Sequence, residues 1–368
     1  MTATNEMAGA VLTVDLGAIQ ENYRIIRKRL GDLACAAAVK ANAYGLGAIE
    51  VSRALASVGC EEFFVVSVEE GIELRPVLGK APIHVLYGPM GGTGTALVEH
   101  NLTPVLNSLG DVERWGAQAK RLGRKLSCDL HFCSGMNRTG FPAAEAATLA
   151  EEPGRFTGLT VDIVMSHLHS ADVPGSPYSA EQLECFHDIR ASFPMGRASL
   201  ANSSGIFLGG DYHFDLSRPG IALYGGNPTP NAANPMRGVI TLQSRILQVR
   251  TIAAGDVVGY GATFRASNIH RVATVPLGYA DGYHRMLSNR GLTHIDGIPC
   301  PVLGRISMDL ISIDVTAVPH DRAHPGAPVE IIGPNQDTEE MAKRTGTNSN
   351  EILTSLGNRF HRIYIGDD

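Results

Sequence analysis

Apolar residues recur with two different spacings along this chain of 368 residues, and the change between them divides the chain. After a short strand-like run at residues 11–15, the apolar positions between residues 16 and 30 repeat at helical spacing and end at Gly31, a common helix stop. Short apolar runs then alternate with helical patterns. The pattern predicts strands at residues 36–39, 63–66, 83–87, 103–106, 126–132, 159–165, 198–201 and 214–216, and helices between them that include residues 49–58, 112–122, 143–150 and 180–193.

Eight strands that alternate with helices over about 200 residues favour a (β/α)8 barrel over a doubly wound parallel sheet. No Gly-x-Gly-x-x-Gly motif follows the first strand, which weakens the dinucleotide-binding alternative. In a barrel, functional side chains are expected just after the carboxyl ends of strands. Six candidates meet this condition: Lys40, Arg138, His167, Asn202, Ser203 and Arg218.

The pattern changes after a connector rich in proline and asparagine at residues 227–231. Strand-like runs at residues 239–249, 271–275, 305–315 and 329–332 follow without long helices between them, and many short turns separate them. The sequence therefore predicts an α/β fold with a (β/α)8 TIM-like barrel domain over residues 10–235. A β-rich C-terminal domain is expected over residues 236–368, with a possible contribution from residues 1–9.

Composition excludes several classes of protein. The net charge is only −6 and no dense basic block occurs, so neither nucleic acid nor an anionic membrane is an expected partner. No apolar run reaches membrane-spanning length, and the first residues do not resemble a secretory signal. The six cysteines are scattered without paired spacing, as is typical of reduced thiols. We expect a soluble cytoplasmic protein.

Residues 36–47 hold the strongest candidate for chemistry. An apolar run ends abruptly in Lys40, and a loop with Tyr44 and two glycines follows. A desolvated lysine loses proton affinity, so it can act as a base or as a Schiff-base nucleophile. The alternative is a strand-end lysine whose ammonium group reaches water. The strand pattern alone does not decide between the two.

A second candidate stretch, residues 218–225, follows the eighth predicted strand. Loops after the seventh and eighth strands of barrels often hold phosphate, and the backbone N–H groups of Gly220 and Ile221 could donate to it together with Ser203. Taken alone, this stretch is more typical of a glycine turn at a strand end. The pair His167 and His169 could suggest a metal, but no third ligand is evident and we expect no metal site.

These stretches resemble the alanine racemase family, and the matching motifs run in family order from about residue 10 onward. In the barrel part, the resemblance covers the lysine motif at residues 36–47 and further motifs at residues 134–140, 166–172, 202–204 and 218–225. In the second part, it covers residues 259–264, 278–282 and 304–309.

The resemblance implies a racemase dependent on pyridoxal 5′-phosphate that interconverts L-alanine and D-alanine and supplies D-alanine for peptidoglycan. Lys40 and Tyr260 are the implied catalytic bases, one on each face of the substrate, because racemisation must remove a proton from one face and return it on the other. Arg138, Tyr279 and Met308 are implied to bind substrate, Met308 through its backbone N–H. The implied cofactor-binding residues are Lys40, Tyr44, His167, Asn202, Ser203, Arg218, Gly220 and Ile221.

The resemblance also implies a homodimer in which Tyr260, Tyr279 and Met308 complete the site of the partner subunit. Several positions depart from the family pattern, among them Leu46, His131 and Asn358. Leu46 replaces a histidine, Asn358 replaces a tyrosine that binds phosphate in many relatives, and His131 replaces a lysine that is often carbamylated. Arg138 must therefore be oriented by other means. A bound anion beside a charged His131 is one option, and an ordinary inward-facing His131 is the other.

Three alternatives stay open on the sequence. The nearest is a racemase of broader specificity on the same fold, acting for example on serine. A decarboxylase on the related barrel would need a partner loop with Cys-Asp, which we do not find. A pyridoxal-phosphate carrier without catalytic activity would have a single barrel, and the second domain with Tyr260 argues against it.

Overall fold

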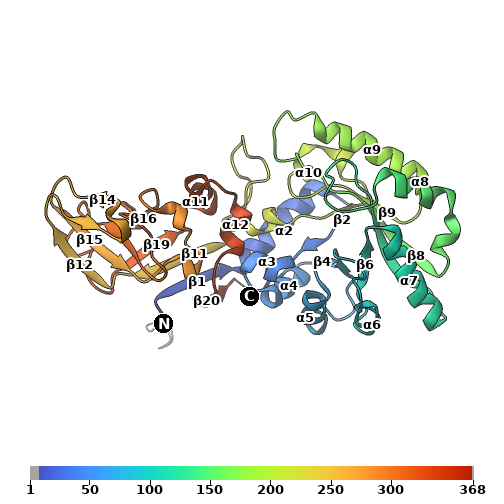
Figure 1. Cartoon of the computed structure of the whole chain (residues 1–368), viewed down its shortest axis with the longest axis horizontal. Helices are drawn as coiled ribbons and strands as arrows, with labels where there is room; N and C mark the ends of the chain where they lie inside the picture. The colour runs from blue at the N-terminus through green and yellow to red at the C-terminus, as the bar shows by residue number, and fades with distance from the viewer. Residues whose placement is uncertain (1–7, 367–368) are drawn as a thin grey trace. The chain divides into compact units, whose positions relative to one another are not determined.

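The structure is a computed structural model that describes residues 8–366 (Figure 1). Its backbone contacts separate two compact units. The barrel unit is Ile19–Arg237. The β-rich unit combines Met1–Ala18 with Gly238–Asp368, of which residues 8–18 and 238–366 are described.

The barrel unit contains a ring of parallel strands. Seven of them pair in chain order: β3 (Ala37–Ala38), β4 (Phe63–Val65), β5 (Ile83–Val85), β6 (Thr103–Leu106), β7 (Leu126–His131), β8 (Leu159–Met165) and β9 (Arg197–Ser199). β10 (Leu216–Ser217) pairs in parallel with β2 (Ala34–Cys35), which leads directly into β3. Backbone bonds from Asp215 N to Ala198 O (3.1 Å) and from Arg218 N to Ala201 O (2.9 Å) link β10 to the end of β9. The ring therefore closes with eight strand positions, and the predicted (β/α)8 barrel is confirmed.

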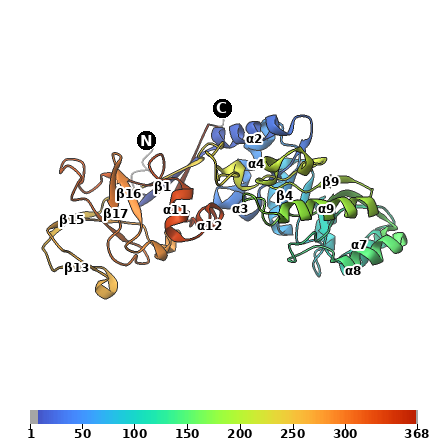
Figure 2. The same ribbon diagram turned by 90° about the horizontal axis from the view of Figure 1, so that it is seen from above.

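Helices cover the outside of these strands, as α7, α8 and α9 do in both views of the ribbon (Figures 1 and 2). Side-chain caps define several helix starts: the hydroxyl groups of Ser67 and Ser108 accept from the amides of Glu70 and Asp111. The helices are α2 (Leu16–Leu30), α3 (Lys40–Gly45), α4 (Ala48–Ser57), α5 (Val68–Leu78), α6 (Gly94–Glu99), α7 (Leu109–Leu122), α8 (Ala143–Glu151), α9 (Tyr178–Ser192) and α10 (Gly205–Leu208), with short 3₁₀ turns η1 (Pro153–Phe156), η2 (Gly210–Tyr212) and η3 (Ile221–Tyr224).

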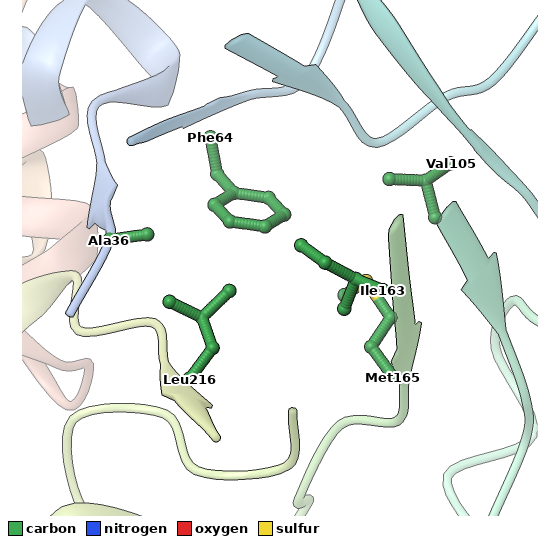
Figure 3. Close-up of a cluster of buried hydrophobic side chains, with 6 residues drawn as sticks. All are labelled: Ala36, Phe64, Val105, Ile163, Met165 and Leu216. Atoms are coloured by element: carbon green, nitrogen blue, oxygen red, sulfur yellow. The ribbon is translucent and has the colours of Figure 1, made fainter. Parts of the chain in front are cut away.

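The barrel interior is packed with side chains from strands on all sides of the ring (Figure 3). Its core cluster consists of Ala36, Phe64, Val105, Ile163, Met165 and Leu216, all buried. Phe64 lies between the others and fills the centre with its ring. Burial of this apolar surface stabilises the barrel by roughly 25 cal/mol for each Å² removed from water.

The barrel interior also contains buried charges. His84 and Asp129 pair in register with core residues and so point to the same side of the sheet. His84 Nδ1 lies 2.6 Å from Asp129 Oδ2, and Glu62 forms a two-pronged ion pair with Arg197 at 2.6 and 2.9 Å. Burial alone would lower the pKa of His84, but Asp129 and Glu62 raise it to about 9. The protonated imidazole thus helps to balance the carboxylates of buried Asp129 and partly buried Glu62.

The β-rich unit is built on a six-stranded sheet in the order β17-β16-β19-β11-β1-β20. Its strands are β17 (Ile298–Pro301), β16 (Leu292–Ile295), β19 (Pro328–Ile332), β11 (Ile240–Arg245), β1 (Ala10–Asp15) and β20 (His361–Ile365). A three-stranded sheet combines β12 (Gln248–Ile252), β15 (His270–Val275) and β18 (Ile311–Asp314), and β13 (Val257–Val258) pairs with β14 (Phe264–Arg265). Two helices, α11 (Thr338–Thr345) and α12 (Ser349–Thr354), complete the described elements beside short 3₁₀ turns.

Strand β1 belongs to the β-rich unit, whereas the sequence analysis assigned residues 10–18 to the barrel. The reason is its pairing: β1 is antiparallel to β11 and parallel to β20, both of which lie more than two hundred residues further along the chain. Its alternating burial shows one face packed against the unit's core.

Two predicted strands of the second part differ in detail. The run at residues 239–249 is two strands, β11 and β12, separated at Ile246 and Leu247. The run at residues 305–315 is a strand only from Ile311 onward, where apolar and polar residues alternate. The β-rich character of the C-terminal part is confirmed.

Candidate active site

Lys40 lies directly after β3, at the start of an unusual turn. Ala41, Asn42, Ala43 and Tyr44 all have φ between 50° and 56°, the left-handed region that non-glycine residues rarely adopt. Each such residue costs on the order of 1–2 kcal/mol. Strain of this size persists only where the surroundings enforce it, and such positions cluster at functional sites.

Glu70 on α5 holds this turn in place. Its Oε1 accepts a hydrogen bond from Ala41 N and its Oε2 accepts one from Val66 N, both at 2.7 Å. One carboxylate thus joins the lysine turn to the end of β4. The sequence analysis missed Glu70, although the Ser67-x-x-Glu70 spacing of a capping box was available as a signal.

The electrostatic surroundings of Lys40 favour its neutral form. Burial lowers the pKa of Lys40, the positive charge of Arg138 lowers it further, and Glu70 acts in the opposite direction. The net direction is downward. A larger fraction of free amine is therefore present at neutral pH than for an exposed lysine.

Tyr44, Ser203 and Gly220 converge beside the lysine turn. The ring of Tyr44 stacks on that of Tyr224 at 4.5 Å, and a Cβ atom on Gly220 would lie 2.2 Å from the Tyr44 hydroxyl oxygen. Ser203 Oγ accepts hydrogen bonds from Gly220 N (2.9 Å) and Ala222 N (3.2 Å). The hydroxyls of Tyr44 and Ser203 thus meet the start of η3 at a point where only a glycine fits.

Arg218 is buried, and its guanidinium donates to Ser199 Oγ and, at 2.6 Å, to Ser166 O. No described carboxylate forms an ion pair with it. Burial lowers its pKa to about 10, with Asp129 acting in the opposite direction, so it remains protonated at neutral pH. No hydrogen bond joins it to His167 among residues 8–366.

The surroundings of His131 favour its neutral form, as expected of an ordinary inward-facing side chain. Its Nδ1 lies 2.8 Å from Asn107 Oδ1, and Asn107 Nδ2 donates to Leu86 O and Val105 O. Because these carbonyls take the amide hydrogens, the Oδ1 must accept and His131 Nδ1 must carry the proton. Burial, followed by the positive charges of Arg218 and Arg138, lowers the pKa of His131 to about 3.

His167 and Asn202 follow β8 and β9. Burial and then Arg218 hold the pKa of His167 well below its usual range. Asn202 Oδ1 accepts from Gly205 N (2.9 Å) and its Nδ2 donates to Leu168 O (3.2 Å). Asn202 therefore anchors the start of α10 within this cluster.

Arg138 lies in the loop after β7, which returns on itself. Phe141 N donates to His131 O (2.7 Å) and Cys133 N donates to Phe141 O (3.0 Å). This closure holds Arg138 close enough to influence the pKa of His131, His167 and Lys40. Its own side chain is exposed and makes no hydrogen bond or ion pair within the described part of the chain. It is thus a free cation at the barrel's carboxyl end.

The remaining predicted site residues lie in the β-rich unit and are exposed. Tyr260 is 73% exposed, Met308 54% and Tyr279 43%. Tyr260 starts the turn η4 (Tyr260–Ala262), and Tyr279 starts η5 (Tyr279–Asp281). Tyr279 N donates to Ser307 O at 3.1 Å, which holds Tyr279 and Met308 in adjacent turns.

At two other departures from the family pattern, Leu46 is fully buried and Asn358 is exposed. No three His, Cys, Asp or Glu side chains within residues 8–366 are grouped to hold a metal ion. In the same range, no helix has the length and apolar character needed to cross a membrane.

Comparison with known proteins decides the family. Residues 14–228 match the N-terminal domain of alanine racemase, and residues 239–364 match its C-terminal domain. The chain belongs to the alanine racemase family. An alanine racemase of Rhodospirillum rubrum is 47% identical over 98% of this chain and 97% of its own length. A catabolic alanine racemase of Mesorhizobium japonicum is 46% identical over 98% of this chain and 94% of its own length.

Solved structures of alanine racemases have the same fold. The enzyme of Bartonella henselae, which has covalently bound pyridoxal phosphate, is 38% identical with a TM-score of 0.94, over 97% of this chain and all of that one. The biosynthetic alanine racemase of Pseudomonas aeruginosa is 33% identical with a TM-score of 0.91, over 98% of this chain and all of that one. The family assignment made from the sequence motifs is confirmed.

Proposed function

We propose that this protein is an alanine racemase that binds pyridoxal 5′-phosphate and interconverts L-alanine and D-alanine. The observation that carries the proposal is the Lys40 amine, whose pKa is lowered, on a strained turn beside the convergent Tyr44, Ser203 and Gly220. Full-length similarity to alanine racemases supports the same reaction. The broader-specificity alternative gains no support from these relatives.

The residues present fit the cofactor. A primary amine with lowered pKa suits attachment of an aldehyde, and the backbone N–H of Ile221 with the hydroxyls of Ser203 and Tyr44 suits a phosphate group. Pyridoxal phosphate, when bound, supplies an electron-withdrawing ring that makes the Cα proton of an amino acid acidic.

Arg218 is proposed to restrict the reaction to proton exchange at Cα. Its guanidinium remains protonated at neutral pH and would give no proton to the ring nitrogen of a cofactor bound beside it. We propose that it keeps the pyridine nitrogen unprotonated, which limits electron withdrawal. Limited withdrawal favours simple proton exchange at Cα over side reactions such as transamination. His167 and Asn202 are proposed to line the ring.

Two bases are proposed to serve the two faces of the substrate. Lys40 takes or returns the Cα proton on one face, and Tyr260 does so on the other. Arg138, an exposed cation without an ion-pair partner among the described residues, is proposed to bind the substrate carboxylate. Tyr279 is proposed to narrow the entrance, and the backbone N–H of Met308, which has no acceptor in residues 8–366, to bind the carboxylate as well.

We further propose a homodimer with sites shared between subunits. Tyr260, Tyr279 and Met308 are large, partly apolar and exposed, as expected of residues that meet another surface. Under this proposal, the barrel unit of one subunit supplies Lys40 and the β-rich unit of its partner supplies the other base. We also propose that the enzyme works in the cytoplasm and supplies D-alanine for peptidoglycan.

The test is incubation of the purified, cofactor-loaded protein with L-alanine in deuterated water, followed by chiral analysis. We expect D-alanine with deuterium at Cα. Tyr260→Phe is expected to lower kcat by roughly 100-fold or more, whereas Tyr178→Phe, at another exposed tyrosine, leaves it unchanged. Absence of D-alanine would refute the proposal. Faster turnover of serine than alanine would favour the broader racemase.

A further inference from the structure

Arg359 forms the most extensive ion-pair arrangement in the described part of the β-rich unit. Its Nε and Nη2 donate to the two carboxylate oxygens of Asp281 at 2.6 and 2.8 Å. Its Nη1 donates to Asp309 Oδ1 at 2.7 Å. All three guanidinium nitrogens are therefore engaged, two of them in the planar fork that arginine forms and lysine cannot. These contacts raise the pKa of Arg359.

The two carboxylates belong to the two turns that carry candidate substrate residues. Asp281 ends the turn that starts at Tyr279, and Asp309 directly follows Met308. Asp281 is buried, and its Oδ2 also accepts from Gly278 N at 2.9 Å, which closes the turn. Arg359 thus connects the C-terminal segment to both turns at once.

The turns themselves are in close backbone contact. Tyr279 N donates to Ser307 O and Ala280 N donates to Met308 O, both at 3.1 Å. A Cβ atom on Gly278 would lie 2.1 Å from Met308 O, so only glycine permits this approach. Gly357 N, two residues before Arg359, donates to Asp281 O at 3.0 Å.

We infer that Arg359 is a positioning residue that fixes the distance between the Tyr279 ring and the backbone N–H of Met308. We call the set Arg359, Asp281 and Asp309 the arginine clamp. The inference rests on the proposed function of Tyr279 and Met308 in substrate binding. Because one group limits the space at the entrance and the other binds the carboxylate, their spacing sets both substrate affinity and the size of side chain that is accepted.

The decisive variant is Arg359→Lys, which keeps the charge and loses the fork. We expect the KM for L-alanine to rise by roughly 5- to 20-fold with a smaller change in kcat. The ratio of kcat/KM for alanine over serine is expected to fall, because a loosened site discriminates less by size. Loss of global stability alone would lower activity on both substrates equally.

Two further variants provide a second test of the inference and a control. Asp309→Asn removes the negative charge that Nη1 faces at an exposed position and so weakens this one contact. It is expected to change KM and selectivity in the same direction as Arg359→Lys, by a smaller factor. Arg322→Lys is the matched control, since Arg322 also forms an exposed ion pair in this unit, with Asp296. It is expected to leave KM and selectivity unchanged.

A readout independent of activity separates this inference from the proposed function. In hydrogen exchange of the cofactor-loaded protein, peptides that contain the Tyr279 and Ala280 amides are expected to exchange faster in Arg359→Lys, while the rest of the unit is unchanged. Wild-type exchange and selectivity in both Arg359→Lys and Asp309→Asn would overturn the inference. A melting temperature lowered with faster exchange throughout the unit would also overturn it, because it indicates a purely structural role. Absence of racemisation by the wild type refutes the proposed function instead.

Discussion

His131 occupies the position of a lysine in the family that the chain resembles, and its surroundings make it an acceptor. Asn107 fixes the proton on Nδ1, so Nε2 carries a lone pair. Arg138 and Arg218 both act on this imidazole, and His167 and Lys40 belong to the same group of interacting charges. The neutral imidazole thus presents an acceptor to a cluster of positive charges.

We therefore predict that His131 stays neutral from about pH 9 to about pH 5, where an ordinary histidine titrates near 6.5. The physical reason is burial together with two nearby guanidinium groups, which lower its pKa to about 3. Nitrogen chemical shifts of labelled imidazoles in the cofactor-loaded protein would measure this. His131→Gln identifies the signal. A protonated His131 at pH 6 would contradict the prediction.

Site residues could be predicted from the sequence where their own type and their immediate neighbours indicated a function. Lys40 ends an apolar run, and Arg218 precedes a Pro-Gly turn. Asn107 and Glu70 reach the site through partners that are distant in sequence, as Asn107 does on His131 and Glu70 on Ala41. Their roles depend on which strands become neighbours, and residue spacing along the chain does not predict that pairing.

Individual elements show which strands and turns hydrophobic periodicity predicts and which it does not. The bounds of β6 and β8 coincide with the predicted runs, because both strands end in consecutive buried apolar residues. The hairpin of β16 and β17 was not predicted, although Asp296-Gly297 between them is a strong signal for a two-residue turn. The left-handed turn of residues 41–44 has no sequence signal, since alanine and tyrosine disfavour that conformation.

The contact between the turn of α3 and the start of η3 leads to a prediction at this scale. We predict that Gly220→Ala weakens cofactor binding by roughly tenfold or more, because the new methyl group would meet the Tyr44 hydroxyl at 2.2 Å and displace one of the two turns. Titration of the cofactor-free protein with pyridoxal phosphate, followed by absorbance, would measure the dissociation constant.

The control is Gly210→Ala, since a Cβ atom at Gly210 meets nothing within 4 Å. This variant is expected to bind the cofactor as the wild type does. Removing the Tyr44 hydroxyl in the double variant Gly220→Ala with Tyr44→Phe is expected to restore part of the affinity. If Gly220→Ala alone binds pyridoxal phosphate with wild-type affinity, cofactor binding does not depend on the close packing of these two turns.

At the scale of the whole molecule, the sequence predicted a barrel unit and a β-rich unit, but it did not predict that the first strand belongs to the β-rich unit. The first strand and the last one flank each other in a single sheet, with Val11 opposite His361 and Asp15 opposite Ile365. Nothing in residues 10–15 distinguishes a strand of this sheet from the first strand of a barrel, because both alternate or run apolar over a few residues. Only the pairing of β1 with β11 and β20 assigns this strand to the β-rich unit.

The proposed sharing of sites between subunits makes the last prediction. Lys40→Ala and Tyr260→Phe are each expected to be nearly inactive as pure homodimers, since each lacks one base in both sites. In a mixed dimer, one site combines the intact Lys40 of one subunit with the intact Tyr260 of the other, and the second site lacks both. Random mixing at equal amounts yields half mixed dimers with one working site of two, so activity should recover to about a quarter of the wild-type value. Dissociation and reassociation of the two variants, followed by a racemisation assay, would measure it. If Lys40 and Tyr260 acted within one subunit, mixing would restore nothing, because every subunit would still lack one base.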